Sequence, residues 1–432
     1  CTFSAMFCFW ISAYTIHFGL VVYSLVCMIG FMTGLEIPLI MRINQTYESL
    51  RENISSVMEY DYYGGLLGGA LFAFVLLPFL GLTYTPVLIG SLNLLVASLV
   101  LWHFSNHLVR PRILNIQFTA LLIISVLAFS VAKPIVLYGE QHKYKDKIIY
   151  QEQTRYQKIV VTQWKDNFWL FINGSTQFST YDEERYHEPL VHPVMSLLKE
   201  HKDILLLGAG DGLAAREILK YSDVESLTLV DLDPAMTRLA RQHKMFLEIN
   251  QGSLNDTRVR VINKDAYQFM KESPDLYDAI IIDLPDPKSV SLSLLYSLGF
   301  YKMVEKHLKP FGAMVTQSTS PLYSPEAFLC IKKTMQAANF STLPYQNSVP
   351  SMGQWGWVLG IRKKTMPANR LKQEIIAQKL SDIETRFFNQ NAMISMANFG
   401  KGLFEKEDKI EPNTQFNHNI LKYYRQGSWD LY

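Results

Sequence analysis

The sequence predicts an α-helical transmembrane region, then a small antiparallel β domain, then an α/β domain built on a parallel sheet. Three observations lead to this prediction. Apolar stretches long enough to cross a bilayer are concentrated in the first 131 residues. Two runs of β-branched and aromatic residues follow them, separated by a short turn. Short apolar runs then alternate with amphipathic segments, which is the pattern of parallel strands covered by helices.

Composition argues against some classes of function. The chain has 432 residues, enough for two or three domains with their own cores. Its net charge of +2 argues against nucleic acid as the main partner, because phosphate binding needs a concentrated basic face. The four cysteines form no CxxC pair, so neither a thiolate zinc site nor a disulfide framework is expected. Because the sequence starts at Cys1 rather than at methionine, we expect residues upstream, with further membrane segments among them.

The N-terminal region, residues 1–133, contains four candidate transmembrane helices: 9–41, 63–82, 84–104 and 113–131. The first exceeds the ~20 residues that a spanning helix needs. We therefore expect a bend or a re-entrant turn near Gly34–Pro38. The connection between the second and third is very short, which predicts an antiparallel hairpin. These lengths disfavour four buried helices of a soluble protein, and the recurrence of apolar segments disfavours a signal peptide.

The rest of the chain divides into three parts. The small β domain, residues 134–184, has two expected strands at 156–163 and 167–174, joined by a hairpin turn. The α/β domain, residues 185–365, has five expected strands, at 204–208, 226–233, 259–263, 277–283 and 312–318. Residues 366–432 form a polar C-terminal tail with one helix expected near Leu371–Phe388.

The stretch RYHEPLVH at 185–192 has the residue types of a zinc-protease helix. Two histidines bind one zinc ion from a helix when they are four residues apart and share a face. His187 and His192 are five apart, with Pro189 between them. The sequence therefore predicts no metal site, and His187 needs another role.

The glycine-rich run LLLGAGDG at 205–212 ends one expected strand and opens a helix expected at Leu213–Lys220. Gly208 and Gly210 allow a sharp turn and a close approach of a ligand to the backbone. Asp231 ends the next strand, 21 residues after Gly210, where a carboxylate can bind both ribose hydroxyls. The run therefore predicts a nucleoside pocket.

Acidic residues follow the first three strands of the α/β domain: Asp211, Asp231 and Asp265. Asp265 is placed to accept a hydrogen bond from an adenine amino group, with Ala266 beside it in the same expected pocket. This acidic rim suits a cationic nucleoside such as a sulfonium and repels a pyrophosphate, so a dinucleotide-dependent dehydrogenase is disfavoured. The alternative, in which each carboxylate only caps a helix, is disfavoured because three occur at successive strand ends.

The fourth strand ends in DLPDP at 283–287. Asp283 and Asp286 lie at the edge of the sheet where α/β folds bind ligands. An alkylammonium nucleophile has a pKa of about 10 and must lose a proton before it attacks. One carboxylate can hold a diamine while the other accepts that proton. The pair therefore favours a polyamine as the substrate.

At these residues the sequence resembles the spermidine synthase family of polyamine aminopropyltransferases, in its membrane-embedded bacterial branch. The resemblance runs from YQKIVV at 156 to VPSMGQWGW at 349–357, and includes GLEIPLIMRI, DYYGGLLGGALFAF and NILKYYRQGSWD. It implies a Rossmann-like fold of the class I methyltransferase type. It also implies aminopropyl transfer from decarboxylated S-adenosylmethionine, a co-substrate, to putrescine or a related amine, with release of methylthioadenosine. Neither a metal nor a permanently bound cofactor is implied.

The resemblance assigns site residues position by position. The catalytic base is Asp283. The substrate-binding residues are Gln157, Tyr186, His187, Asp211 and Asp286. The residues that hold the nucleoside of the donor are Gly208, Gly210, Asp231, Asp265 and Ala266. Of the substrate-binding set, Gln157 matches a nucleoside-binding glutamine, and the pair Tyr186–His187 matches a pair that contacts the diamine and the aminopropyl end of the donor. Asp211 matches the residue that holds the donor's amino group.

The sequence departs from the soluble members of the family at three places. Residues 208–213 read GAGDGL where those members read GGGDGG, and the loop at 288–297 reads KSVSLSLLYS. Residues 349–352 read VPSM where soluble members have a tyrosine that touches the acceptor. The donor half of the site is therefore well matched and the acceptor half is altered.

Two alternative functions remain open: a methyltransferase that uses intact S-adenosylmethionine, and a membrane transporter or polyamine sensor that binds without turnover. Basic residues fall on both sides of the expected membrane, so the positive-inside rule gives no orientation. Because the donor is made in the cytosol, we expect residues 134–432 there, on a multi-pass protein of the cell (inner) membrane. The expected partners are a small-molecule amine, the lipid bilayer and further copies of the chain in a homo-oligomer, with no nucleic acid.

Overall fold

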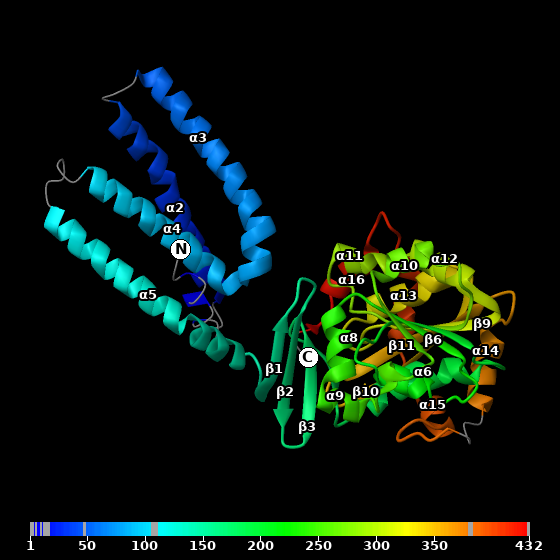
Figure 1. Ribbon diagram of the computed structural model, residues 1–432. Helices are drawn as coiled ribbons and strands as arrows, with labels where there is room; N and C mark the ends of the chain where they lie inside the picture. The colour runs from blue at the N-terminus through cyan, green and yellow to red at the C-terminus, as the bar shows by residue number, and fades with distance from the viewer. Residues whose placement is uncertain are drawn as a thin grey trace. The chain divides into compact units, whose positions relative to one another are not determined.

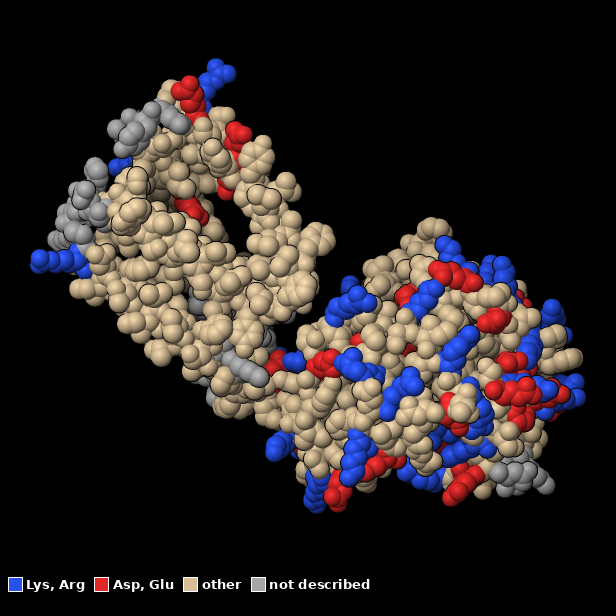
Figure 2. All heavy atoms as spheres, viewed as in Figure 1, with Lys and Arg blue, Asp and Glu red and all other residues tan. Residues whose placement is uncertain are grey.

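The protein is described by a computed structural model that covers residues 18–45, 49–104, 111–378 and 383–429, together with Ser4, Phe7, Cys8 and Ile11. The chain separates into two compact units, residues 1–148 and 149–432. Figure 2 shows how different their surfaces are: that of the first unit carries few charged side chains, whereas Lys, Arg, Asp and Glu cover the second.

The N-terminal unit consists of long helices (Figure 1). They are α2 (Phe18–Asn44), α3 (Leu50–Leu71), the π-helical η1 (Phe72–Leu76), α4 (Leu77–His103) and α5 (Pro111–Gln141). In the part of the chain that the structure describes, four stretches are long and apolar enough to cross a membrane: Gly19–Asn44, Arg51–Gly81, Tyr84–His103 and Arg112–Val131. Large apolar side chains along these helices are exposed, as expected for helices that face lipid. The four predicted apolar helices are confirmed.

Their limits differ from the sequence prediction. Helix α2 continues through Gly34–Pro38, so the predicted bend there is wrong; most of residues 9–17 lie outside the described residues. The second span begins at Arg51, well before the predicted residue 63, because the Ser49 side chain caps α3 by accepting from the amide of Glu52. The predicted short turn coincides with Gly81, which interrupts the helix with φ 64°. Helix α5 extends past the predicted boundary at residue 133.

A small four-stranded antiparallel sheet follows, in the order β1-β2-β3-β4. Its strands are β1 (Lys147–Gln153), β2 (Lys158–Trp164), β3 (Asn167–Ile172) and β4 (Ser175–Ser179). Trp164 pairs with Asn167 across a tight turn, which confirms the predicted hairpin. The sequence prediction did not include β1 or β4.

A seven-stranded sheet forms the centre of the second unit, in the order β10-β11-β9-β8-β5-β6-β7. Its strands are β5 (Asp203–Gly208), β6 (Ser226–Asp231), β7 (Val259–Asn263), β8 (Tyr277–Asp283), β9 (Leu308–Gln317), β10 (Phe340–Val349) and β11 (Gly353–Arg362). The five predicted strands are all present. The five predicted strands run parallel to one another, as expected. The whole sheet is mixed, because β10 and β11, which the sequence prediction did not include, are added at one edge and β11 runs antiparallel to both of its neighbours. The α/β Rossmann-like fold class is confirmed.

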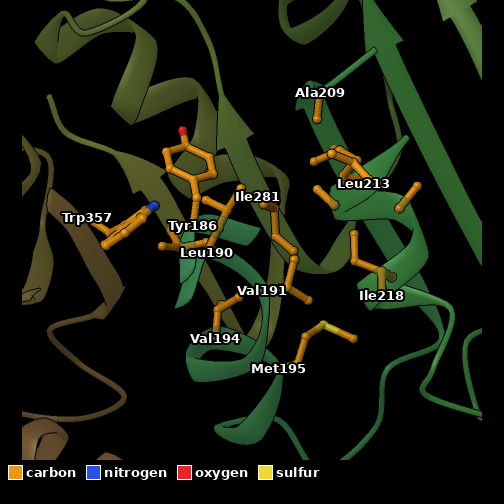
Figure 3. Packing of buried hydrophobic residues seen from close by; sticks show 14 of the residues in the cluster. Tyr186, Leu190, Val191, Val194, Met195, Ala209, Leu213, Ile218, Ile281 and Trp357 are labelled. Atoms are coloured by element: carbon orange, nitrogen blue, oxygen red, sulfur yellow. The ribbon is translucent and has the colours of Figure 1, made fainter. Parts of the chain in front are cut away.

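Both faces of this sheet are buried. Along β5, Ile204 and Leu206 belong to one apolar cluster and Leu205 and Leu207 to the other, because successive side chains of a strand point to opposite faces. Helices α6 (Glu184–Ser196) and α7 (Leu213–Ile218) contribute to the first cluster. Figure 3 shows Leu190, Val191 and Met195 of α6 in this cluster, with the Tyr186 hydroxyl pointing away from them. This packing fixes α6, which carries two of the predicted site residues.

The remaining helices cover the sheet and form the C-terminal tail. They are α8 (Pro234–Gln242), α9 (Lys244–Ile249), η3 (Ser253–Asn255), α10 (Ala266–Glu272), α11 (Val290–Leu294), α12 (Leu298–His307), α13 (Pro325–Ala337), α14 (Ala368–Ala377), α15 (Gln390–Met396), η4 (Leu403–Lys409) and α16 (Asn419–Arg425). The helix predicted near Leu371–Phe388 ends at Ala377. Beyond the gap at 379–382, the backbone amides of residues 386–388 donate instead to the buried Glu188 carboxylate, which is incompatible with a continued helix.

Candidate active site

Several predicted site residues end neighbouring strands or follow them directly: Gly208 and Gly210 at β5, Asp231 at β6, Asp265 after β7 and Asp283 at β8. Gly208, the last residue of β5, lies directly beside Asp283, the last residue of β8, in the parallel register. Gly208 has φ +82°, and a Cβ there would lie 2.0 Å from the carbonyl oxygen of Asp283. A Cβ on Gly210 would lie 2.5 Å from a carboxylate oxygen of Asp231. Only glycine fits at both positions, which explains the glycine motif in physical terms.

Asp231 is bound by the glycine loop. Its carboxylate accepts from the Gly210 amide at 3.1 Å and from the Asp233 amide at 2.8 Å. The protein shields most of this carboxylate from water, and the nearby negative charges of Asp211 and Asp233 add to that effect. Together they raise the pKa of Asp231 to about 6, although the two amides act to lower it.

The turn between β1 and β2 is attached to the same strand end. The Thr154 hydroxyl donates to the Asp233 carboxylate at 2.8 Å. Thr154 also fixes the loop that contains Gln157, because its hydroxyl accepts from the Gln157 amide at 3.0 Å. Gln157, which is partly buried, is therefore held on the loop connected to the end of β6.

Asp211 and Asp265 both accept a hydrogen bond from a backbone amide at the start of a helix. Asp211 is nearly buried and accepts from the Leu213 amide at 2.8 Å. Asp265 is exposed, and it caps α10 by accepting from the Gln268 amide at 2.9 Å, next to the buried Ala266. The helix-capping alternative therefore describes Asp265, and Asp211 makes a similar contact one residue before the cap of α7.

Asp283 is paired with Tyr186 of α6, whose hydroxyl donates to the carboxylate at 2.5 Å. Shielding from water raises the pKa of Asp283 to about 6, although the charge of His187 and the Tyr186 hydrogen bond act to lower it. Tyr186 is itself buried, with its ring 5.4 Å from that of Trp357. A carboxylate with this pKa is well suited to accept a proton near neutral pH.

Asp286 is held on both of its oxygens. The Tyr424 hydroxyl donates to one at 3.0 Å, and the Gln317 side-chain amide lies 3.4 Å from the other. Shielding from water raises the pKa of Asp286. The Gln317 amide also donates to the Tyr296 hydroxyl at 2.6 Å, and its oxygen accepts from the Trp355 indole at 3.3 Å.

Sequence reasoning missed Gln317, Tyr296, Trp355 and Tyr424 as neighbours of Asp286. Tyr424 lies in the NILKYYRQGSWD segment, and Trp355 lies in VPSMGQWGW, so the resemblance marked both segments without giving these residues a role. Within VPSM, Met352 is buried, and the Ser351 hydroxyl and amide both bind Asp182 at 2.7 Å. Met352 thus stands in the core where soluble members are expected to have a tyrosine.

The two histidines of α6 have separate partners. His187 Nδ1 lies 3.0 Å from the Glu183 carboxylate, which also pairs with Arg216 at 2.9 Å. Burial alone would lower the pKa of His187, but Glu183 raises it. His192 Nε2 lies 3.0 Å from Glu217. Among the residues that the structure describes, no group of three or more His, Cys, Asp or Glu has an arrangement that could hold a metal ion.

Comparison with known proteins adds independent evidence. Residues 183–373 match the family model of the spermine/spermidine synthase domain. The chain is 40% identical over 407 residues to the polyamine aminopropyltransferase of Oceanobacillus iheyensis, an alignment that covers 92% of this chain and 76% of that protein. It is 37% identical over 408 residues to the polyamine aminopropyltransferase of Leptospira interrogans, covering 94% of this chain and 80% of that protein.

A crystal structure of spermidine synthase in complex with the transition state analogue AdoDATO is similar in fold. The TM-score is 0.55 at 24% sequence identity, over 61% of this chain and 89% of that chain. At this identity the likeness concerns the fold alone.

Proposed function

The chain belongs to the polyamine aminopropyltransferase family and is an aminopropyltransferase, and from that premise we propose its substrates and the roles of its residues. The donor is decarboxylated S-adenosylmethionine and the acceptor is putrescine or a related amine. The products are the aminopropylated amine and methylthioadenosine. Family membership favours this reaction over methyl transfer and over binding without turnover.

The observation that carries the proposal is the environment of Asp283. This carboxylate ends β8 beside the glycine loop, receives the Tyr186 hydroxyl, and has a pKa raised to about 6. It therefore remains ionised at neutral pH while being a stronger base than an exposed aspartate.

The proposed reaction is a displacement at the carbon next to the sulfonium sulfur. The acceptor amine loses a proton to the Asp283 carboxylate, and its nitrogen lone pair forms the new C–N bond. The C–S bond breaks, and its electron pair stays on sulfur, which leaves as neutral methylthioadenosine. Because the leaving group needs no protonation, placing the amine in line with the C–S bond is the main task of the protein.

The other residues bind and orient the two substrates. Asp231 receives the ribose hydroxyls, Asp265 and Ala266 form the adenine side, and Gln157 reaches the nucleoside from the β1–β2 loop. Asp211 holds the donor's amino group. Asp286, fixed by side chains on both oxygens, binds the distal ammonium of the diamine. Tyr186 and His187 line the region between donor and acceptor.

A product assay tests this assignment directly. The purified full-length protein is supplied with putrescine and either decarboxylated or intact S-adenosylmethionine, and the products are identified by mass spectrometry. We expect methylthioadenosine and an aminopropylated diamine with the first donor and no S-adenosylhomocysteine with the second. Formation of S-adenosylhomocysteine would overturn the proposed donor.

We also propose that the four apolar helices span the cell membrane and that the catalytic unit faces the cytosol, where the donor is made. Labelling of single cysteines with an impermeant reagent in intact cells tests this orientation, in a variant without native cysteines. Lys143 precedes the catalytic unit, and Gln45 lies between the first two spans, on the same expected side as His107, which lies outside the described residues. We expect labelling at position 45 and protection at 143; the reverse pattern would place the catalytic unit outside.

A further inference from the structure

We infer that Tyr424, on the C-terminal helix α16, is an acceptor-positioning residue that fixes the Asp286 carboxylate for the diamine. This inference rests on the proposed function, in which Asp286 binds the distal ammonium. Tyr424 is not among the site residues predicted from the sequence. Its hydroxyl binds Asp286, which lies 138 positions earlier in the chain.

The contact between the two residues is well defined. The Tyr424 hydroxyl donates to one oxygen of Asp286 at 3.0 Å, and Gln317 approaches the other from β9 at 3.4 Å. Tyr424 is buried, whereas Asp286 remains partly exposed. A carboxylate offers about four lone-pair positions, so these two donors leave room for an ammonium on the open side. The carboxylate is therefore oriented before the amine arrives.

The tail holds Tyr424 in one place. The Trp429 indole donates to the Tyr424 carbonyl oxygen at 2.8 Å, and the two rings lie 4.5 Å apart. The Ser428 amide donates to the Tyr323 carbonyl oxygen at 2.7 Å. Ile420 on the same helix is fully buried. These contacts already anchor the tail without the Tyr424 hydroxyl. The hydroxyl is instead directed at Asp286, a carboxylate of the candidate site.

The hydroxyl has two expected effects on Asp286. It restricts the orientation of the carboxylate, which lowers the entropy that diamine binding must remove. It also stabilises the ionised form, since the Tyr424 hydrogen bond acts against the shielding that raises the pKa of Asp286. An ionised and oriented Asp286 is what a distal ammonium requires, so loss of the hydroxyl weakens binding of the acceptor and leaves the donor unaffected.

The test is Tyr424→Phe in the full-length protein, with Tyr423→Phe as the matched control. Tyr423 directly precedes Tyr424 in the chain. Its hydroxyl accepts from the Glu411 amide at 3.3 Å and not from a group at Asp286. At saturating donor, we expect Tyr424→Phe to raise the KM for the diamine by about 10- to 150-fold, the range for one hydrogen bond to a charged group. The KM for the donor should stay within about twofold, and Tyr423→Phe should leave both constants unchanged.

A second readout excludes a purely structural role. Without the hydrogen bond, the pKa of Asp286 should rise further, so the loss of diamine affinity on acidification should begin at a higher pH in Tyr424→Phe than in the wild type. A role in tail anchoring alone would lower the melting temperature and leave this pH profile in place. Because KM does not depend on the fraction of protein that folds, the KM for the diamine can still be compared when a variant is partly unfolded.

Asp286→Asn separates failure of the inference from failure of the proposed function. If Asp286→Asn raises the KM for the diamine while Tyr424→Phe leaves it unchanged, Tyr424 is not a positioning residue and the role of Asp286 stands. If Asp286→Asn leaves that KM unchanged, the proposed role of Asp286 is wrong and the inference falls with it. If the diamine KM rises in both variants and the donor KM is unchanged, the proposed roles of Asp286 and of Tyr424 are both supported.

Discussion

On the proposed donor side of the site, the carboxylates bind backbone amides, and only Asp231 also reaches an amide far away in the chain, that of Gly210. On the proposed acceptor side, the carboxylates bind side chains that are distant in sequence. Asp211 accepts from an amide two residues away, and Asp265 from one three residues away. Asp283 instead accepts from Tyr186, 97 positions earlier, and Asp286 from Tyr424, 138 positions later. One side is held by the backbone amides of loops, and the other by side chains of distant elements.

This difference separates the two binding tasks. A carboxylate held by its own loop keeps its orientation when a distant helix changes. A carboxylate held by helices α6 and α16 depends on how those helices pack. Substitutions on distant elements, such as helix α16, can therefore change the proposed acceptor side while leaving the proposed donor side in place.

The largest expected effect comes from removing the charge of Asp283. We expect Asp283→Asn to lower kcat by about two to four orders of magnitude, the usual contribution of a positioned general base. The dissociation constant of the donor should be nearly unchanged, since the residue acts on the amine. Stopped-time product assays and equilibrium donor binding measure the two quantities. Turnover like that of the wild type would remove Asp283 from the mechanism.

The second-largest expected effect is on the free energy of unfolding, through the charge of Glu183 at the start of α6. Burial acts to raise the pKa of Glu183, but His187, Arg216 and Arg386 lower it to about 2, compared with 4.5 in an unfolded chain. The stabilisation is therefore complete above pH 4.5 and is lost as the pH falls towards 2. We expect Glu183→Gln to lower the free energy of unfolding by about 3 kcal/mol at pH 7.

Denaturant unfolding in detergent at pH 7 and at pH 4 measures this effect. The difference in the free energy of unfolding between Glu183→Gln and the wild type should be smaller at pH 4. The control is Glu225→Gln, which removes an exposed ion pair with Lys202 and should leave the free energy of unfolding nearly unchanged. If this difference is the same at both pH values, the charge of Glu183 is not what stabilises α6.

A smaller effect is expected from pH alone. The pKa of Asp283 is about 6 in the free protein, and a base works only when deprotonated. We therefore expect kcat/KM for the amine to fall at least about tenfold for each pH unit below 6, and more steeply where Asp286 also becomes protonated. Above pH 6 we expect a plateau until the amine and other groups titrate. An acid limb centred near pH 4 would mean that the shielding of Asp283 does not persist in the working enzyme.

The same contrast explains what could be predicted from sequence. The five parallel strands, and the placement of Gly208, Gly210 and Asp231 at strand ends, follow from local patterns. Strand β11 was missed because its direction is set by pairing with β9 and β10. Tyr424 was missed for a related reason: no local pattern indicates which carboxylate a hydroxyl of a distant helix will reach.

The most direct test of the division into two sides compares Asp231→Ala with Asp286→Asn in one set of assays. Asp231→Ala should weaken donor binding by about tenfold or more through loss of hydrogen bonds to the ribose, and leave the diamine KM within about twofold. Asp286→Asn should raise the diamine KM by a similar factor and leave the donor dissociation constant unchanged. We expect this crossed pattern. If either substitution changes both constants to the same extent, the two sides of the site are not independent.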